Sequence, residues 1–165
     1  MKTVKATKKK SISEDVYEKL KQDHRKVEKI FKTLLDSDEE DVEVREENFR
    51  ELKALLDAHT KAEEELFYPV TEEAETTRDL TLEAYEEHKI AKTLLAELDA
   101  LNKDDEIWSA KIKVLSEAIK HHVKEEEQEL FPKAKKVISK DEAIVLKEQV
   151  EEIEEEELEQ HRIAS

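Results

Sequence analysis

The stretch His122–Pro132, HVKEEEQELFP, decides the fold that we expect, because a near copy, HTKAEEELFYP, stands earlier in the chain as His59–Pro69. Each copy opens with a His-x-x-x-Glu pair. The two pairs are His59 with Glu63 and His122 with Glu126. Residues four apart on an α-helix lie on one face, so each pair directs an imidazole nitrogen and a carboxylate the same way. Each copy therefore predicts half of a metal site.

A lone histidine stands one helix upstream of each copy, His24 before the first and His88 before the second. From His24 to His59 is 35 positions and from His88 to His122 is 34, so the pattern is a duplicated helical hairpin with an offset of 63 or 64 residues. Two such hairpins packed together bring four histidines and two glutamates into one interior, which a single hairpin could not do.

The composition describes one charged, folded domain. A length of 165 residues suits a single domain. Charged residues make up 45% of the chain, yet the apolar residues recur periodically, which indicates a helical protein with a charged exterior. Glycine and cysteine are absent, which excludes glycine-dependent phosphate loops, disulfides and thiolate ligands. Any bound metal must use nitrogen and oxygen ligands.

The net charge is −16, and the first ten residues include five lysines, so the remainder is more acidic still. Because like charges repel, we expect no nucleic-acid partner for the body of the protein. No apolar run approaches the roughly 20 residues of a membrane span, and no signal peptide is apparent. We therefore expect a cytoplasmic protein without a membrane partner, and the oligomeric state stays open.

Four periodic stretches predict helices, and each carries a histidine on its apolar line. The expected helices run from Ser13 to about Asp36, from Val42 to Val70, from Leu80 to Leu101, and from after Asp105 to Pro132. The prolines should kink or end their helices, and Thr71–Asp79 reads as an irregular turn. Short connections between such helices favour an all-α fold, an antiparallel up-down-up-down four-helix bundle.

We divide the chain into three parts. Residues 1–12 are expected to form a basic disordered tail, and residues 13–138 the four-helix bundle. Residues 139–165 are expected to form an additional C-terminal acidic helix, packed on or extending from the bundle. Ser139, followed by Asp141 and Glu142, is its predicted cap, and the acidic end is expected to fray.

Six buried ligands suit two divalent cations, with each glutamate bridging both ions. The expected metal ligands are His24, His59, Glu63, His88, His122 and Glu126. A core histidine is commonly a packing residue, and a lone His-x-x-x-Glu is commonly a surface ion pair. One inner histidine on every helix, with a glutamate on the apolar line of two of them, favours the metal site. Imidazole and carboxylate ligands favour iron, manganese or zinc. His121 and His161 are expected to be solvent histidines.

These motifs resemble the hemerythrin-like, HHE cation-binding family over about Val16–Glu152. The matching stretches are DHRKVEKIF, HTKAEEELFYP, EEHKIAKTLL and HHVKEEEQELFP. The resemblance implies a non-haem di-iron centre of two Fe ions, Fe2+ or Fe3+ with an oxo or hydroxo bridge, with Mn or Zn as substitutes. It implies His24 and His59 on one iron, His88 and His122 on the other, and Glu63 and Glu126 as bridges.

One position departs from the oxygen carriers that the pattern resembles. Those proteins place a further histidine one turn before the third-helix ligand, where this chain has Ala84. One iron would then have fewer protein ligands, and Tyr85, Glu28 or water are the candidates to fill the vacancy. An open position favours reactive chemistry over reversible oxygen carriage.

We therefore expect a di-iron protein whose partner is a small ligand, O2, peroxide or NO. Catalase-like or peroxidase-like turnover, or NO handling, are the activities such a centre would support. No nucleophilic triad or other catalytic group stands apart from the metal site, and no organic cofactor site is apparent. Two alternatives stay open: an iron sensor or storage protein whose fold depends on metal, and a metal-free helical interaction bundle.

Overall fold

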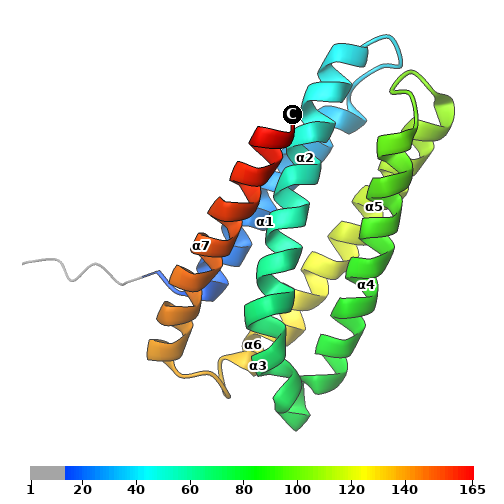
Figure 1. The fold of residues 1–165 in the computed structure, drawn as a ribbon. Helices are drawn as coiled ribbons and strands as arrows, with labels where there is room; N and C mark the ends of the chain where they lie inside the picture. Colours follow the sequence, from blue (N-terminus) through cyan, green and yellow to red (C-terminus); the bar gives the residue numbers. More distant parts are fainter. Residues whose placement is uncertain (1–13) are drawn as a thin grey trace, which may run out of the picture.

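The computed structural model describes residues 14–165 and shows only helices and connecting turns in that part of the chain (Figure 1). Four long antiparallel helices form the bundle. They are α1 (Val16–Leu35), α2 (Val42–Ala62), α4 (Glu75–Ala100) and α5 (Glu106–Glu125). A further helix, α7 (Lys140–Ala164), packs on α1 and α2. The predicted four-helix bundle with an additional C-terminal helix is confirmed; the predicted tail, 1–12, lies outside the described residues.

Both α2 and α5 widen into a π-helical turn and then continue as a short α-helix. The segments are η1 (Glu63–Phe67) with α3 (Tyr68–Glu73), and η2 (Glu126–Leu130) with α6 (Phe131–Ala134). In each turn a backbone N–H bonds to the carbonyl five residues earlier, from Tyr68 to Glu63 and from Phe131 to Glu126. Pro69 and Pro132 follow directly. Because the wider turn displaces the carbonyls that a proline ring would meet in an α-helix, neither helix ends there.

The connection between the two hairpins is shorter than predicted. We expected an irregular turn over 71–79, but α3 continues to Glu73 and α4 begins at Glu75, so the break is Ala74 alone, with extended backbone. Buried threonine hydroxyls satisfy this corner: Thr77 donates to the carbonyl of Thr71, and Thr81 donates to the Thr71 hydroxyl at 2.8 Å. Because these hydroxyls form hydrogen bonds within the corner, the polar residues of this stretch do not need an exposed, irregular turn.

Capping residues set the ends of the outer helices. Asp15 caps α1 by accepting a bond from the Glu18 N–H, whereas Ser13 lies outside the described residues. Ser139 and Glu142 form the predicted capping box of α7. The expectation that α7 frays in its acidic end was wrong, since the helix continues to Ala164. Ion pairs from α2 reach that end, with Lys61 Nζ 2.7 Å from Glu157 and Asp57 3.1 Å from His161.

The buried apolar side chains form two clusters separated along the bundle axis. One contains Leu20, Ala62 and Leu130, and the other contains Val27, Leu56 and Ile119. On α1, on α2 and on α5 with η2, the buried members of these clusters before the inner histidine therefore belong to one cluster and those after it belong to the other. The polar residues of the predicted site occupy the layer between the two clusters.

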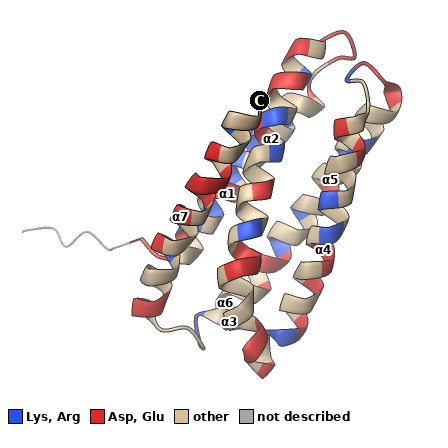
Figure 2. Cartoon of the chain, in the orientation of Figure 1, with Lys and Arg blue, Asp and Glu red and all other residues tan. Residues whose placement is uncertain are grey.

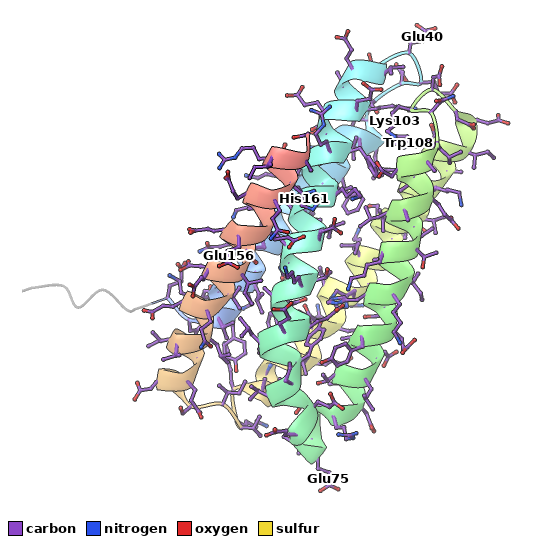
Figure 3. The ribbon with its side chains drawn as sticks, in the orientation of Figure 1. Glu40, Glu75, Lys103, Trp108, Glu156 and His161 are labelled. Atoms are coloured by element: carbon purple, nitrogen blue, oxygen red, sulfur yellow. The ribbon has the colours of Figure 1, made fainter. Side chains whose placement is uncertain are left out.

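Acidic and basic residues are interspersed along the helices (Figure 2), and most of them are exposed. Arg45 is a buried exception at the end of the bundle marked by Lys103 and Trp108 in Figure 3. Its guanidinium donates to the carbonyls of Ser37 and Lys103 and lies 5.1 Å from the Trp108 ring. These contacts join the turns of the two hairpins. Within 14–165 no helix has both the length and the apolar character needed to cross a membrane.

Candidate metal centre

The structure brings all six predicted site residues into one buried layer. His24 comes from α1, His59 from α2, Glu63 from η1, His88 from α4, His122 from α5 and Glu126 from η2. None of the six is more than 5% exposed, and Glu63 is fully buried. They form two groups in which the nitrogen and oxygen atoms lie within 4.8 Å of one another. One group is His24, His59, Glu63 and Glu126; the other is Glu63, His88 and His122.

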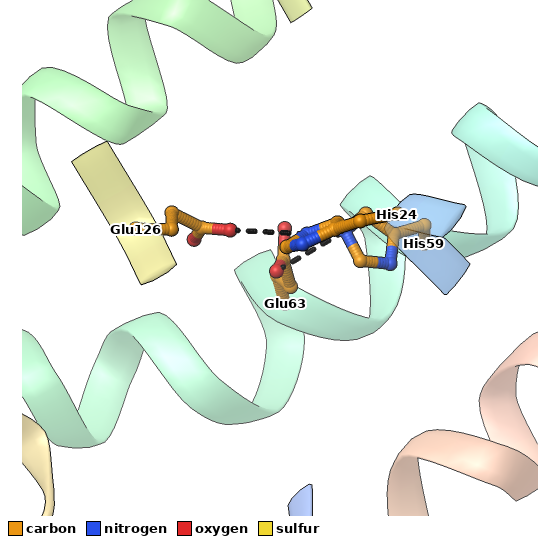
Figure 4. Close-up of side chains that lie close together, drawn as sticks. All are labelled: His24, His59, Glu63 and Glu126. Atoms are coloured by element: carbon orange, nitrogen blue, oxygen red, sulfur yellow. Dashed lines mark hydrogen bonds and ion pairs between the residues drawn. The ribbon is translucent and has the colours of Figure 1, made fainter. Parts of the chain in front are cut away.

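The first group joins the two hairpins (Figure 4). The Nε2 atoms of His24 and His59 are 3.2 Å apart. His59 Nε2 lies 3.3 Å from Glu63 Oε1, and His24 Nε2 lies 3.4 Å from Glu126 Oε2. All four side chains point toward a common space between α1, α2 and η2 (Figure 4).

The second group repeats this arrangement. The Nε2 atoms of His88 and His122 are again 3.2 Å apart. His88 Nε2 lies 3.3 Å from Glu63 Oε2, and His122 Nε2 lies 3.5 Å from Glu126 Oε2. Glu63 thus offers one oxygen to each group. A single oxygen of Glu126 lies between His24 and His122, so both glutamates connect the two groups.

These distances fit a pair of cations. Ligand atoms placed about 2.1 Å from one ion lie about 3.0 to 3.4 Å from each other, depending on the coordination geometry. The observed separations of 3.2 to 3.4 Å lie within that range, and the His122–Glu126 separation of 3.5 Å lies just above it. Glu63 Oε1 and Glu126 Oε2 are buried without a hydrogen-bond partner among the described residues. Buried carboxylate oxygens without a donor are costly, and a cation would satisfy them.

Three of the histidines are held from behind by carboxylates. The Nδ1 atoms lie 2.8 Å from Glu127 for His24, 2.9 Å from Glu64 for His88, and 2.6 Å from Glu87 for His122. A proton on Nδ1 that is donated to the carboxylate leaves the Nε2 lone pair directed at the centre. These rings are therefore oriented as metal ligands require.

The supporting carboxylates were not among the residues predicted from the sequence. Glu64 and Glu127 directly follow the site glutamates, so the doubled Glu in both motif copies was the signal. Each reaches the lone histidine of the opposite hairpin. His59 differs from the other three, since its Nδ1 lies 3.8 Å from Asp23 and 3.9 Å from Glu154 and makes no hydrogen bond within the described chain.

Tyr68 is a further site residue that the sequence reasoning missed. Its hydroxyl donates to Glu126 Oε1 at 2.8 Å and lies 3.1 Å from His88 Nε2. Tyr68 is five residues after Glu63, and the π-turn places a residue at that spacing over the centre. The second copy has Phe131 at this position, so the hydroxyl belongs to one half only.

The two protein candidates for the missing ligand do not reach the centre. The ring of Tyr85 packs against the ring of Tyr68, with centroids 5.1 Å apart. Glu28 is exposed and pairs with Arg25. The structure therefore places the Tyr68 hydroxyl, rather than either predicted side chain, beside His88.

The electrostatics of the layer favour cations. Burial alone would raise the pKa of Glu63, but the charges and hydrogen bonds of His59 and His88 outweigh it and hold the pKa well below its usual range. Burial would lower the pKa of His122, but Glu126 and Glu87 raise it to about 9. Burial, with the charges of Glu126 and Glu63, raises the pKa of Tyr68 well above its usual value. Glu63 thus stays ionised, and the negative charge around the layer draws protons onto His59 and His122.

The remaining histidines lie at the surface. His121 is exposed, with its Nε2 3.3 Å from Glu125. His161 of α7 is partly exposed and contacts Asp57 of α2. Neither belongs to the buried layer.

Comparison with known proteins agrees with this geometry. The model of the hemerythrin HHE cation binding domain matches residues 15–134. A DNA nickase from Nostoc sp. is 30% identical over 117 residues, which cover 71% of this chain and 32% of that protein. The chain thus spans about a third of the length of that relative.

A crystal structure with the same fold is that of a hemerythrin HHE cation binding domain-containing protein from Mycobacterium kansasii. It superimposes with a TM-score of 0.78 over 89% of both chains, at 23% sequence identity. The family match covers the four bundle helices and every residue of the buried His and Glu layer. The chain therefore belongs to the hemerythrin HHE cation-binding domain family.

Proposed function

We propose that this protein binds two iron ions in the buried layer and uses them to bind or react with O2, peroxide or NO. The observation that carries the proposal is the pair of His and Glu groups that share Glu63. Six side chains from two hairpins converge with the separations that two adjacent cations require. Membership of a cation-binding family supports the same conclusion.

We assign His24 and His59 to one ion and His88 and His122 to the other. Glu63, with one oxygen beside each histidine pair, and Glu126, with one oxygen between His24 and His122, would contribute to holding both ions. Iron is proposed over zinc because the small ligands named above call for a redox-active metal. Bound iron would supply electron transfer and an open position for the ligand.

Tyr68, Phe67 and Phe131 surround the position where a small ligand would bind. Tyr68 keeps its proton at neutral pH because burial raises the pKa of the phenol, so its hydroxyl can donate a hydrogen bond beside Glu126 and His88. Phe131 lies parallel to the His24 ring, with centroids 6.2 Å apart, and Phe67 packs against Phe131. These buried aromatic rings exclude bulk water from one end of the layer.

The proposal is tested by metal content and the optical spectrum after anaerobic loading with ferrous iron and admission of air. We expect two irons per chain and a ferric charge-transfer band. A variant with His59→Ala and His122→Ala should lose both signals. His121→Ala is the matched control, because this histidine is adjacent in sequence but exposed, and it should retain them. One iron or none in the wild type, or no effect of the double variant, would end the redox proposal.

Measurements with peroxide, O2 and NO distinguish an enzyme from a carrier or sensor. Peroxide consumption at a rate proportional to bound iron would identify an enzyme of the catalase or peroxidase type. Tight O2 or NO binding without turnover would identify a carrier or sensor. Both measurements need the double histidine variant as the blank, since free iron itself reacts with peroxide.

DNA cleavage is not part of the proposal. The match to the nickase covers about a third of that protein, and the described residues have a large excess of acid (Figure 2). An acidic surface disfavours approach of DNA phosphates. We expect a supercoiled plasmid to stay intact with this protein and Mg2+ or Mn2+. Nicking that the double histidine variant lacks would contradict this expectation.

A further inference from the structure

The helix α7 lies outside the family match, which ends at residue 134, yet it brings a carboxylate to a site histidine. The buried residues of α7 are Ala143, Leu146, Val150 and Glu154, at steps of three and four that define one helix face. Glu154 therefore ends the apolar stripe that packs on the bundle. It is 8% exposed, and its Oε1 lies 3.9 Å from Nδ1 of His59. A carboxylate on a buried stripe is costly unless it has a partner.

Lys19 of α1 supplies that partner. Its ammonium donates to both Asp23 and Glu154, and all three side chains are buried. Asp23 Oδ2 lies 3.8 Å from the same Nδ1 of His59. One lysine thus fixes two carboxylates on the outer side of His59. Burial and the charge of Asp23 raise the pKa of Glu154 to about 7.

His59 also has the one Nδ1 among the four inner histidines that lacks a short carboxylate contact. The other three lie 2.6 to 2.9 Å from a glutamate. Within the described chain, His59 Nδ1 and Glu154 Oε1 are both buried without a hydrogen-bond partner. Because these two atoms are 3.9 Å apart, a small rotation of either side chain would make the missing bond.

We propose that Glu154 is the positioning residue of His59, and that metal occupancy of the His24 and His59 group is thereby coupled to the docking of α7. The inference rests on the proposed metal site. An ion bound by Nε2 favours the tautomer with a proton on Nδ1, and this N–H donates a hydrogen bond to Glu154. The anchored carboxylate in turn favours the ring orientation that the ion needs. Such coupling is reciprocal. The free energy by which docked α7 strengthens metal binding equals the free energy by which the bound ion stabilises the docking of α7.

The coupling concerns one ion only. In the other group, His88 and His122 are held by Glu64 and Glu87, which belong to the bundle and not to α7. On the α7 side, the contacts of Lys61 with Glu157 and of Asp57 with His161 link the helix directly to α2, the helix that carries His59. Occupancy of the first group therefore has a direct path to α7 through His59, whereas the carboxylates that hold His88 and His122 belong to the bundle.

The test uses the full chain with Glu154→Gln, which keeps the size of the side chain and removes its charge. The control is Glu156→Gln, an exposed position on the same helix (Figure 3). Two quantities are measured under anaerobic conditions. The affinities of the two ferrous ions come from competition with a chelator, and the protection of residues 140–164 comes from amide hydrogen exchange with and without the metal.

In the wild type we expect ferrous iron to slow amide exchange across α7. In Glu154→Gln we expect one ion to bind about 10- to 100-fold more weakly, the other to be unchanged, and the metal effect on α7 exchange to disappear. The control should behave as the wild type. A merely structural role would weaken both ions together and speed exchange in the metal-free protein as well.

The inference is overturned if the wild type binds two ions but Glu154→Gln retains both affinities and α7 exchange ignores the metal. Equal weakening of both ions overturns it too. In those cases the proposed metal function stands. A wild type that binds no iron overturns the function and the inference together, so the two failures are distinguishable.

Discussion

A single hydroxyl makes the two halves of the buried layer unequal. Tyr68 and Phe131 hold equivalent positions in the two motif copies, but only Tyr68 can donate a hydrogen bond, and it donates to Glu126. The polar donor thus lies on the His88 side of the centre.

Replacement of the hydroxyl gives the first prediction. Tyr68→Phe leaves Glu126 Oε1 buried without its donor, so the free energy of unfolding of the metal-free protein should fall by about 1 to 3 kcal/mol in a urea titration. Tyr85→Phe is the control, because Tyr85 packs against Tyr68 but its ring does not reach the centre. Equal losses in the two variants would show that the Tyr68 hydrogen bond contributes nothing of its own.

The histidine charges give a prediction for pH. The pKa of His122 is raised to about 9 in the folded, metal-free protein, against an ordinary value of about 6.5. A histidine whose pKa is higher in the folded than in the unfolded protein stabilises the fold fully at any pH below its unfolded pKa. This stabilisation is lost as the pH rises through its folded pKa. We therefore expect the unfolding free energy of metal-free protein to fall between pH 6.5 and 9, by on the order of 3 kcal/mol.

Urea titrations at pH 6, 8 and 10 measure this loss. His122→Gln should remove the part that His122 contributes, and the part due to His59, whose pKa is also raised well above its ordinary value, should remain. Iron affinity should move in the opposite direction over the same interval, because the ion must displace the proton that His122 holds. A stability that does not change from pH 6 to pH 10 in the wild type would contradict the assignment.

At the scale of elements, the π-turns η1 and η2 determine which side chains face the centre. Helical periodicity continued from His59 and Glu63 would bring Phe67 over the site, four residues on. The π-turn adds one residue, so Tyr68 takes that place and Phe67 joins the apolar cluster. Such turns often mark functional sites, and here two occur at matching positions of a duplicated hairpin.

Docking of α7 gives the prediction for this scale. Val150 is fully buried on the face that packs on the bundle, whereas Val145 on the same helix is half exposed. Val150→Ala should therefore lower the unfolding free energy by about 1 to 3 kcal/mol, and Val145→Ala by less than about 0.5 kcal/mol. Urea titration of both variants checks this. Equal effects would mean that α7 extends from the bundle rather than packing on it.

At the scale of the whole molecule, stability should depend on the metal. Glu63 and Glu126 each bury an oxygen that no group in residues 14–165 satisfies by hydrogen bonding. Ferrous iron at a thousandfold excess over its dissociation constant would stabilise the fold by about 4 kcal/mol per ion, or on the order of 10 °C in Tm. Calorimetry with and without a chelator measures the shift. It should vanish in the His59→Ala, His122→Ala variant and persist in His121→Ala.

Much of the fold and of the candidate site could be predicted because both depend on helical periodicity. The histidine on each apolar line and the repeated His-x-x-x-Glu located the six side chains that the structure brings together. Tyr68 could not be found this way, because the π-turn at Glu63–Phe67 breaks the periodicity before Tyr68. Glu154 could not be found because it stands in a run of glutamates, where the sequence does not distinguish a buried carboxylate from solvated ones.

The contacts behind the histidines also cross between the two halves of the chain. Glu127 of the second hairpin holds His24 of the first, and Glu64 of the first holds His88 of the second. The single extended residue between the hairpins, Ala74, is then not what keeps them together. A protein cleaved at Ala74 should therefore elute from a sizing column as one particle even after chelation, because these contacts and the two shared apolar clusters join the hairpins without the peptide bond.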